Sequence, residues 1–482
     1  MNVKSNKFYQ QYENLSIQSR ATICYTLCNI LQRGISLITI PAYTRILSQE
    51  QYGEYSVFLS WIEIFEIIAT FRIAYGGYVV GLTKYEEDRD TYSSSMQCLS
   101  IVITSFFLIL YLCCSSWINR FTDMGTVMTL MIFALLYAMP AIQFWTARRR
   151  VEYRYLSVLF ITIISSFFML VLGLIAAVFS KDKATAVVGA RVIVQGGIGL
   201  FLIYVNCKKQ FKFYHKEYWN RAMKFNVPLL PYYLSTVLLH NSDRIIIKSL
   251  VGKAEAATYS VAYSASMALQ LFGSSINQAL QPWLFKKLKD KSYDGIGKVI
   301  NLSLLIIALI NLMLIAFAPE AVRILAPPEF QEAIWIIPPL ASSVVVMFFY
   351  QHFINVEFFF EESRITSVAS IGAAGLNILL NYWLIPIFGY LAAGFTTLIS
   401  YMVFGVVHYI FMRIVCKKND CPTDLFDIKT MLLILFGFAT ATVILAVGYK
   451  FIWIRILAIA IGAFCVYIKR RQLFSILKEL KK

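Results

Sequence analysis

Four ionisable residues interrupt an apolar helical pattern near the middle of the chain: His240, Asp243, Arg244 and Lys248. On an α-helix, His240, Arg244 and Lys248 form one stripe about 80° wide and about 12 Å long, and Asp243 lies on its flank. An ionised side chain at the centre of a bilayer is costly, so such residues face the interior of a helix bundle or a water-filled cavity. The stripe therefore predicts a basic cavity at membrane depth that holds an anion.

Three more arginines lie inside apolar stretches, namely Arg33, Arg72 and Arg191. We expect them to line the cavity together with Arg244 and Lys248. A guanidinium forms paired hydrogen bonds with phosphate oxygens, and an ammonium acts as a movable point charge. The alternative is that each cation forms an internal ion pair that only fixes packing, or that Lys248 extends to the outer membrane surface.

Carboxylates and a histidine at the same depth are candidates for reversible binding of an ion. Glu63, Glu66, Asp243 and His240 could take up a proton or a sodium ion, because ionisable groups at membrane depth mark ion pathways and proton relays. The alternative is that each carboxylate neutralises a neighbouring arginine, and that His240 is held by ordinary packing and hydrogen bonds. The sequence leaves both interpretations open.

Prolines and cysteines in the apolar stretches indicate structure rather than chemistry. Pro228 and Pro231 remove backbone donors just ahead of the charged stripe, which predicts a bend and makes them candidate hinge or gating residues. The nine cysteines follow no metal-binding or disulfide spacing. We therefore expect no metal site and no cofactor.

The composition places all of these residues in a membrane protein. Hydrophobic residues make up 59% of the 482 residues and charged residues only 15%, which is far too apolar for an ordinary soluble chain. The net charge of +17 is typical of nucleic-acid-binding proteins, but the basic residues follow no nucleic-acid-binding motif. The expected class is an all-α polytopic membrane protein without a nucleic-acid partner.

Apolar windows of about 20 residues, each long enough to cross the hydrocarbon core, occur fourteen times. The predicted spans are residues 21–44, 55–82, 93–113, 126–147, 155–179, 184–206, 225–251, 254–280, 297–318, 333–356, 365–385, 389–412, 430–448 and 451–468. With a cytoplasmic N-terminus, the cytoplasmic connections and tails, together with Lys298 at the cytoplasmic end of its span, hold 31 of the 44 lysines and arginines, and the opposite connections hold seven. This asymmetry predicts a multi-pass protein of the cell membrane, plasma or inner, with both termini cytoplasmic.

The predicted spans divide into two lobes of six helices and two appended helices. The tripeptide Tyr-Ser-Val recurs at residues 55–57 and 259–261, at the start of the second helix of each lobe, which indicates a parallel duplication. The predicted boundaries are a cytoplasmic segment 1–20, an N-lobe 21–206, a basic cytoplasmic linker 207–224, a C-lobe 225–413, a cytoplasmic connection 414–429, helices 13 and 14 in 430–468, and a basic cytoplasmic tail 469–482.

Several short passages resemble one family of transporters. They are residues 40–48 (IPAYTRILS), 52–56 (YGEYS), 227–231 (VPLLP), 242–246 (SDRII) and 259–263 (YSVAY). They are similar to the first-helix exit, and to the seventh helix and its sequel, of Wzx-type polysaccharide-biosynthesis flippases. Those flippases belong to the multidrug/oligosaccharidyl-lipid/polysaccharide exporter superfamily, and the similarity in layout covers essentially the whole chain.

The resemblance implies two six-helix lobes around a central cavity that opens alternately to the two sides of the membrane. The implied substrate is a polyprenyl-diphosphate-linked oligosaccharide, moved from the inner to the outer leaflet for capsule, O-antigen or other surface polysaccharide synthesis. The implied partners are membrane lipids and the polysaccharide polymerase and glycosyltransferases of the same pathway. No enzymatic chemistry is expected.

Three other functions fit the sequence less well. A peptidoglycan lipid-precursor flippase and a cation-coupled drug exporter belong to the same superfamily. A membrane polysaccharide polymerase belongs to a different class, and the short predicted outside connections count against it. The first predicted span has no acidic residue, which counts against the drug exporter.

Overall fold

The computed structural model describes residues 17–453, 455, 456 and 460. For a few of these residues, Arg33 among them, it describes the backbone but not the side chain. Every regular element in the described residues is a helix, which confirms the all-α prediction. The chain divides into two compact units, residues 1–234 and 235–482. Most of the predicted last span, 451–468, and nearly all of both terminal segments lie outside the described residues.

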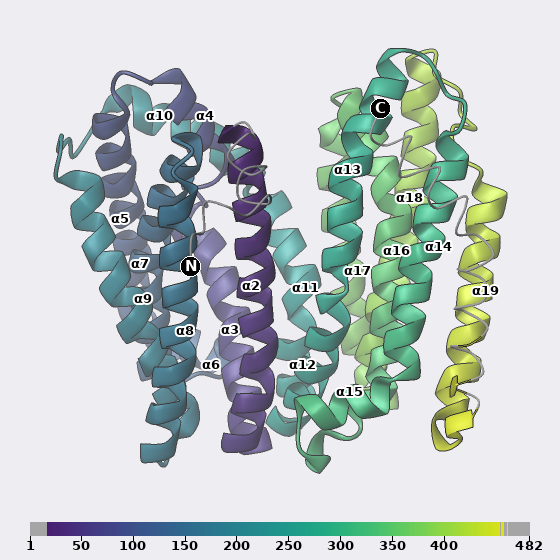
Figure 1. Ribbon diagram of the computed structural model, residues 1–482. Helices are drawn as coiled ribbons and strands as arrows, with labels where there is room; N and C mark the ends of the chain where they lie inside the picture. The colour runs from purple at the N-terminus through teal and green to yellow at the C-terminus, as the bar shows by residue number, and fades with distance from the viewer. Residues whose placement is uncertain (1–16, 454, 457–459, 461–482) are drawn as a thin grey trace, which may run out of the picture. The chain divides into compact units, whose positions relative to one another are not determined.

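The first unit is organised around α7 and α9. These two helices pack against each other, α8 packs on α9, α2 packs on α8, and α3 and α5 each contact both central helices. Figure 1 draws the unit in purple to teal. Its helices are α2 (Ile17–Ile46), α3 (Gln49–Thr70), α4 (Gly76–Lys84), α5 (Arg89–Cys113), α6 (Ser115–Thr122), α7 (Thr126–Val151), α8 (Tyr155–Phe179), α9 (Lys183–Cys207) and α10 (Lys216–Asn226).

The predicted second span, residues 55–82, is not one helix. The helix α3 ends at Thr70, and Phe71 and Arg72 adopt left-handed backbone angles, with φ of 51° and 47°. The Thr70 hydroxyl accepts a hydrogen bond from the Arg72 N–H at 3.2 Å, which satisfies a donor that the broken helix leaves without its usual partner. The helix resumes at Gly76 as α4. Arg72 therefore lies in a turn, and its position cannot be deduced from helical spacing.

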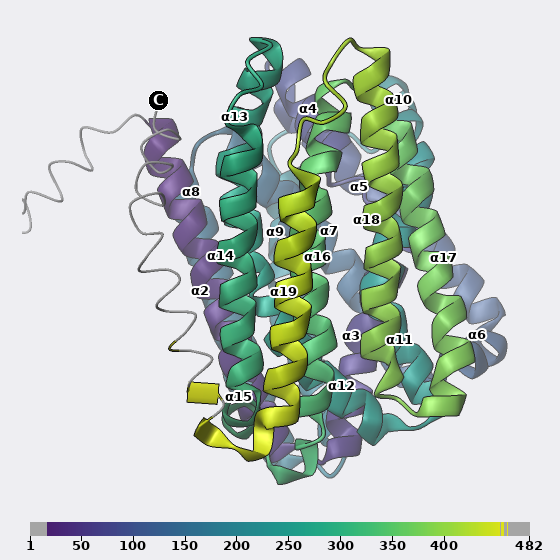
Figure 2. The same cartoon turned by 90° about the vertical axis from the view of Figure 1, so that its right-hand side faces the viewer.

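The second unit is organised around α16. This helix packs against α12, α14 and α18, while α17 packs on α18 and α19 on α14, as Figure 2 shows. Its helices are α12 (Lys253–Ala268), α13 (Gln270–Lys289), α14 (Ile296–Ala316), α15 (Ala318–Leu325), α16 (Ala333–Phe359), α17 (Ser363–Phe388), α18 (Ala392–Lys418) and α19 (Ile428–Val447). Helix α11 (Leu230–Leu250) runs across the division between the units.

Within the described residues, nine helices are long and apolar enough to cross a membrane. They are α5, α7, α8, α9, α14, α16, most of α17, α18, and α19 with its 3-10 extension. Helices α2, α3, α11 and α13 lie wholly or partly in further predicted spans and are not among these nine. The chain is thus a polytopic membrane protein, and the number of fourteen spans stays a prediction.

Two further boundaries differ from the sequence prediction. The predicted eighth span, residues 254–280, is divided into α12 and α13 at Leu269. The predicted linker, residues 207–224, contains most of the amphipathic helix α10. Its residues Tyr218, Ala222 and Asn226 are buried and stand four apart, so one face packs on the first unit and the other stays polar.

Candidate functional site

Arg244 lies on α11 and is held by a tyrosine of α12. Its guanidinium carbon stands 4.3 Å from the centre of the Tyr263 ring, and its Nη1 donates a hydrogen bond to Asn241 Oδ1 at 3.0 Å. The hydroxyl of the same tyrosine lies 3.0 Å from His240 Nδ1, and the Tyr401 hydroxyl lies 3.2 Å from that nitrogen. Two residues of the predicted stripe, Arg244 and His240, therefore meet at one aromatic side chain. Sequence reasoning did not identify Tyr263 or Tyr401 as partners.

Asp243 is completely buried and is bound by three other helices. Its carboxylate accepts hydrogen bonds from Tyr259 of α12, from Asn381 of α17 at 2.6 Å and from Thr397 of α18 at 2.7 Å. Among the residues that the structure describes, these partners are all uncharged, so the pairing with Arg244 that the sequence left open is not formed. A buried carboxylate without a cation carries a large desolvation cost when ionised.

A buried amide and hydroxyl network extends from this carboxylate. Asn381 donates to Asn377 Oδ1 at 3.2 Å and accepts from Thr396 at 2.5 Å, and Ser242 donates to Asn377 at 3.0 Å. Sequence reasoning missed this network. Its one local signal is a pair of asparagines four residues apart in an apolar span, where an amide must find a partner within the bundle.

The first unit contains a separate charged site at the end of α3. Glu66 is buried and accepts a hydrogen bond from Gln143 of α7 at 2.7 Å. The guanidinium carbon of Arg72 lies 4.6 Å from the centre of the Tyr75 ring and 5.4 Å from that of Tyr233. Gln143 also lies 3.5 Å from the Tyr75 hydroxyl, so it links the carboxylate to the ring on which the arginine stacks. Sequence reasoning missed Gln143 and Tyr75.

The remaining predicted cations lie on α9, α11 and α2. Arg191 of α9 donates to Gln195 Oε1 at 3.1 Å. Its charge also acts on Glu66, as does that of Arg72, so these three groups share one neighbourhood of the first unit. Lys248 lies one turn beyond Arg244 on α11 and is only 8% exposed. Arg33 lies in α2 and its side chain is outside the described part.

Glu63 and the two candidate hinge prolines complete the predicted set. Glu63 is exposed on α3, whereas Glu66, three residues later, is buried. Pro228 lies in a 3-10 turn, Val227–Leu229, and Pro231 is the second residue of α11. The structure thus has a change of helix type at the predicted bend.

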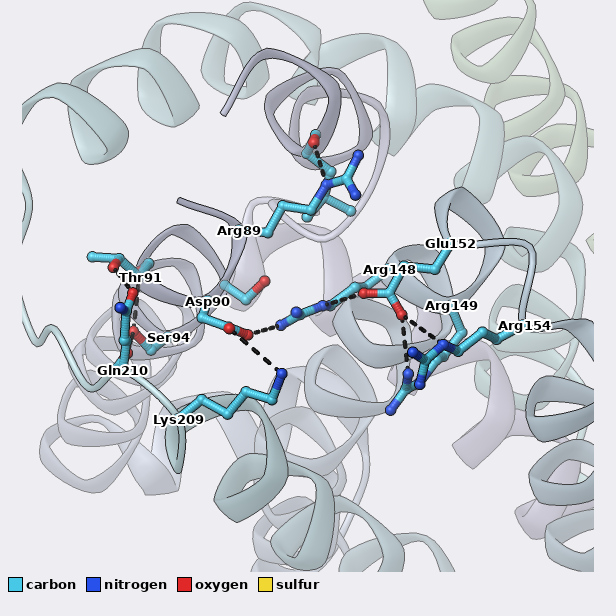
Figure 3. Close-up of polar contacts among 12 residues, drawn as sticks. Arg89, Asp90, Thr91, Ser94, Arg148, Arg149, Glu152, Arg154, Lys209 and Gln210 are labelled. Atoms are coloured by element: carbon cyan, nitrogen blue, oxygen red, sulfur yellow. Dashed lines mark hydrogen bonds and ion pairs between the residues drawn. The ribbon is translucent and has the colours of Figure 1, made fainter. Parts of the chain in front are cut away.

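A second group of charges closes one end of the first unit, where α5 begins and α7 ends (Figure 3). Arg148 lies 2.6 Å from Asp90 Oδ1 and 2.8 Å from Glu152 Oε1, Arg149 lies 3.0 Å from Glu152, and Lys209 lies 3.6 Å from Asp90. Burial raises the pKa of Glu152, but the hydrogen bond and charge of Arg148 outweigh burial and hold the pKa below its usual value. These ion pairs connect α5, α7 and the connection after α9.

Several solved structures with a similar fold are transporters. An inward-facing multidrug resistance MATE family transporter of the MOP superfamily is 13% identical, with a TM-score of 0.57, covering 81% of this chain and 96% of that chain. An outward-facing MATE structure is 14% identical, with a TM-score of 0.56, covering 86% and 99%. A MOP superfamily transporter from Pyrococcus furiosus is 13% identical, with a TM-score of 0.52, covering 82% and 95%. The fold of this chain is therefore similar to that of these MOP superfamily transporters.

The family follows from the sequence itself. The chain belongs to the polysaccharide biosynthesis protein family, whose model matches residues 19–288. A curated relative, an uncharacterized membrane protein of Methanocaldococcus jannaschii, is 24% identical over 229 residues, which is 46% of this chain and 45% of the relative. The matched region thus spans about half the length of that relative.

Proposed function

We propose that this protein is a flippase that moves polyprenyl-diphosphate-linked oligosaccharide units from the inner to the outer leaflet of the cell membrane. The product would be capsule, O-antigen or another surface polysaccharide. The observation that supports the proposal most directly is a pair of arginines within apolar stretches, Arg72 and Arg244, in a chain of the polysaccharide biosynthesis family. A diphosphate is the anion that such cations suit and that this family's substrates would offer.

The way each arginine is held supports a binding role. A guanidinium stacks through its face and binds phosphate through its edge, so a tyrosine can orient it without competing for the same hydrogen-bond donors. Tyr263 holds Arg244 in this way, and Tyr75 and Tyr233 hold Arg72. Arg33, Arg191 and Lys248 are proposed as further cationic contacts of the headgroup. The polyprenyl tail would stay in lipid, and no covalent chemistry is needed.

Asp243 is proposed as the coupling group. Its neutral, hydrogen-bonded pocket ties α11 to α12, α17 and α18, so uptake or release of a proton or sodium ion changes the charge at a point where four helices meet. Such a change can shift a conformational equilibrium only through different affinity for the two states. Glu63, Glu66 and His240 are the other candidates for coupling, and the turn at Pro228 and Pro231 is a candidate hinge.

The test compares two arginines that both lie over a tyrosine. Arg244→Ala should abolish leaflet transfer of a polyprenyl-diphosphate oligosaccharide in proteoliposomes, while the level of folded protein stays normal. Arg413 is exposed and lies 5.9 Å from the Tyr409 ring, so Arg413→Ala is the matched control and should transfer at the wild-type rate. Retained transfer by Arg244→Ala would show that this arginine does not hold the substrate.

The same vesicles separate the alternative functions. A peptidoglycan lipid precursor, a cationic drug and a polyprenyl-diphosphate oligosaccharide are offered in turn, with and without proton and sodium gradients. Transfer of the precursor alone would assign the first alternative, and drug export alone would assign the second. Equal transfer by the wild type with and without either gradient would exclude ion coupling through Asp243.

A further inference from the structure

The first unit has a basic pocket whose residues belong to none of the sites described above. It has a volume of about 540 Å³ and lies where the end of α4 meets α10. The two helices lie together at one end of the unit in Figure 1. Its walls include Lys84, Tyr85, Glu217, Arg221, Lys224 and Phe225. All of these residues except Phe225 lie in connections that are predicted to be cytoplasmic, so we expect the pocket to open at the cytoplasmic membrane surface.

Helix α10 is fixed firmly enough to make a preformed site. The Tyr218 hydroxyl donates to Asp88 Oδ2 at 2.5 Å, and the Trp219 indole donates to Ser95 Oγ at 3.0 Å. Both anchors are on the apolar side of α10, so the polar side of the helix is held in place as well. A fixed wall reduces the ordering cost of binding.

The absence of a side chain at Gly77 allows the Phe225 ring to pack closely against α4, where it forms the apolar wall of the pocket. A Cβ at Gly77 would lie 2.8 Å from Phe225 Cδ1, a distance that a side chain could not tolerate without movement of the ring. Phe225 is nevertheless 41% exposed, and it lines the pocket. The pocket therefore combines charge with an apolar edge, as a lipid headgroup site requires.

The charges in the pocket do not balance. Its single carboxylate, Glu217, accepts a hydrogen bond from the Tyr85 hydroxyl at 2.6 Å. Lys84 Nζ and the Arg221 guanidinium carbon lie 5.4 Å and 5.7 Å from the centre of the Tyr85 ring. In the described part of the chain, none of Lys84, Arg221 and Lys224 forms an ion pair. Three cations against one carboxylate leave a net charge of about +2 in one hollow, and the repulsion among them is relieved by an anion.

We propose that this pocket binds the diphosphate headgroup of the lipid-linked substrate at the cytoplasmic surface, before the lipid reaches the arginines at membrane depth. A diphosphate that links a lipid to a sugar carries about two negative charges, which matches the pocket, whereas the headgroup of a common anionic phospholipid carries about one. The identity of the lipid rests on the proposed function. The pocket itself rests on the geometry of α4 and α10.

The test is binding of farnesyl diphosphate to the full-length protein in nanodiscs of phosphatidylcholine. The variant Lys84→Gln/Arg221→Gln/Lys224→Gln should weaken this binding about ten-fold or more, because three charge-assisted contacts are lost. The matched control, Lys212→Gln/Lys216→Gln/Lys289→Gln, removes three exposed cations outside the pocket and should change binding by less than about two-fold. If the triple variant does not fold, Lys224→Glu alters one exposed residue and should weaken binding in the same direction.

The possible results separate this inference from the proposed function. Equal losses in the pocket and control variants would overturn the pocket, as would full displacement of the diphosphate by an equal amount of phosphatidylglycerol. Loss of binding in Arg244→Ala with an unchanged pocket variant would also overturn it and would leave the flippase proposal intact. Pocket-dependent binding in a wild-type protein that transfers no polyprenyl-diphosphate oligosaccharide would overturn the proposed function and support the pocket.

Discussion

The guanidinium carbon of Arg244 lies 4.3 Å from the centre of the Tyr263 ring, and the hydroxyl of that ring lies 3.0 Å from His240 Nδ1. One side chain thus serves an arginine through its π face and a histidine through its oxygen. The two contacts can be removed separately, because phenylalanine keeps the ring and leucine removes it.

Tyr263→Leu should lower the initial rate of leaflet transfer by about 2-fold to 30-fold, the range that corresponds to a cation–π energy of about 0.5–2 kcal/mol. Tyr263→Phe should stay within about two-fold of wild type, because the ring still orients Arg244. The rate is measured in proteoliposomes at equal protein density. If the phenylalanine variant loses as much activity as the leucine variant, the hydroxyl and His240 are the important contact.

The buried pair Glu357 and His408 should be far more important for stability than an exposed pair nearby. Both side chains are fully buried, and His408 Nδ1 lies 2.8 Å from Glu357 Oε1. His408→Ala leaves the carboxylate with Thr366 as a hydrogen-bond donor and should cost about 3–5 kcal/mol. The exposed pair of Lys418 and Glu362 is the control, and Glu362→Gln should cost less than about 1 kcal/mol.

Thermal unfolding in detergent measures both changes. The double variant Glu357→Gln/His408→Ala should be more stable than His408→Ala, because it no longer buries an unmatched carboxylate. A double variant as unstable as the single one would show that packing of the imidazole, rather than the charge of Glu357, sets the cost.

The ion pairs of Glu152 should make the free energy of unfolding depend on pH. The folded pKa of Glu152 lies below its usual value of 4.5, because the contributions of Arg148, Arg149 and Arg154 outweigh the effect of burial. A depressed pKa contributes stability that is fully present above pH 4.5 and is lost as the pH falls through the folded pKa. Glu152→Gln should therefore melt below wild type at pH 7, with a difference that shrinks as the pH falls below 4.5.

A neighbouring carboxylate provides the control for this pH dependence. Glu87 is exposed in the connection before α5, so Glu87→Gln should follow the wild-type melting temperature at every pH. A constant difference between Glu152→Gln and wild type from pH 7 down to the acid limit would mean that hydrogen-bond geometry, rather than charge, provides the stabilisation.

Alanine substitutions at two glycines of α9 should have different effects on stability. A Cβ at Gly199 would lie 2.4 Å from the Ala138 Cβ and 2.5 Å from its Cα, on the central helix α7, whereas a Cβ at Gly197 would meet nothing within 4 Å. Gly199→Ala should cost about 1–3 kcal/mol through overpacking. Gly197→Ala should be neutral or stabilising by up to about 1 kcal/mol, since alanine favours a helix. Similar melting temperatures of the two variants would contradict the close approach of α7 and α9.

The sequence was sufficient for most of the helical layout. Apolar windows predicted α5, α7, α8, α9, α14, α16, α18 and α19, because the length and hydrophobicity of a span are local properties of the chain. The helix breaks were not predictable in this way. The turn at Phe71 and Arg72 has no proline to mark it, and it depends on hydrogen bonds around Thr70.

The candidate site was predictable only in its charged members. A buried charge is conspicuous in an apolar sequence, so Asp243, Arg244 and Glu66 were recognised from residue type alone. Their neutral partners could not be recognised, because tyrosine, asparagine and threonine are common in spans and their role depends on which side chains pack against them. Asn381 is separated from Asp243 by 138 residues, and Gln143 from Glu66 by 77.

Residue type and spacing thus determined that the chain crosses a membrane and keeps positive charge within its apolar stretches. Tertiary structure decided which uncharged groups surround each charge, because hydrogen bonds between helices depend on how distant segments pack. It also decided that Asp243 is matched by a tyrosine, an amide and a hydroxyl rather than by the arginine beside it, since neighbours on a helix point in different directions.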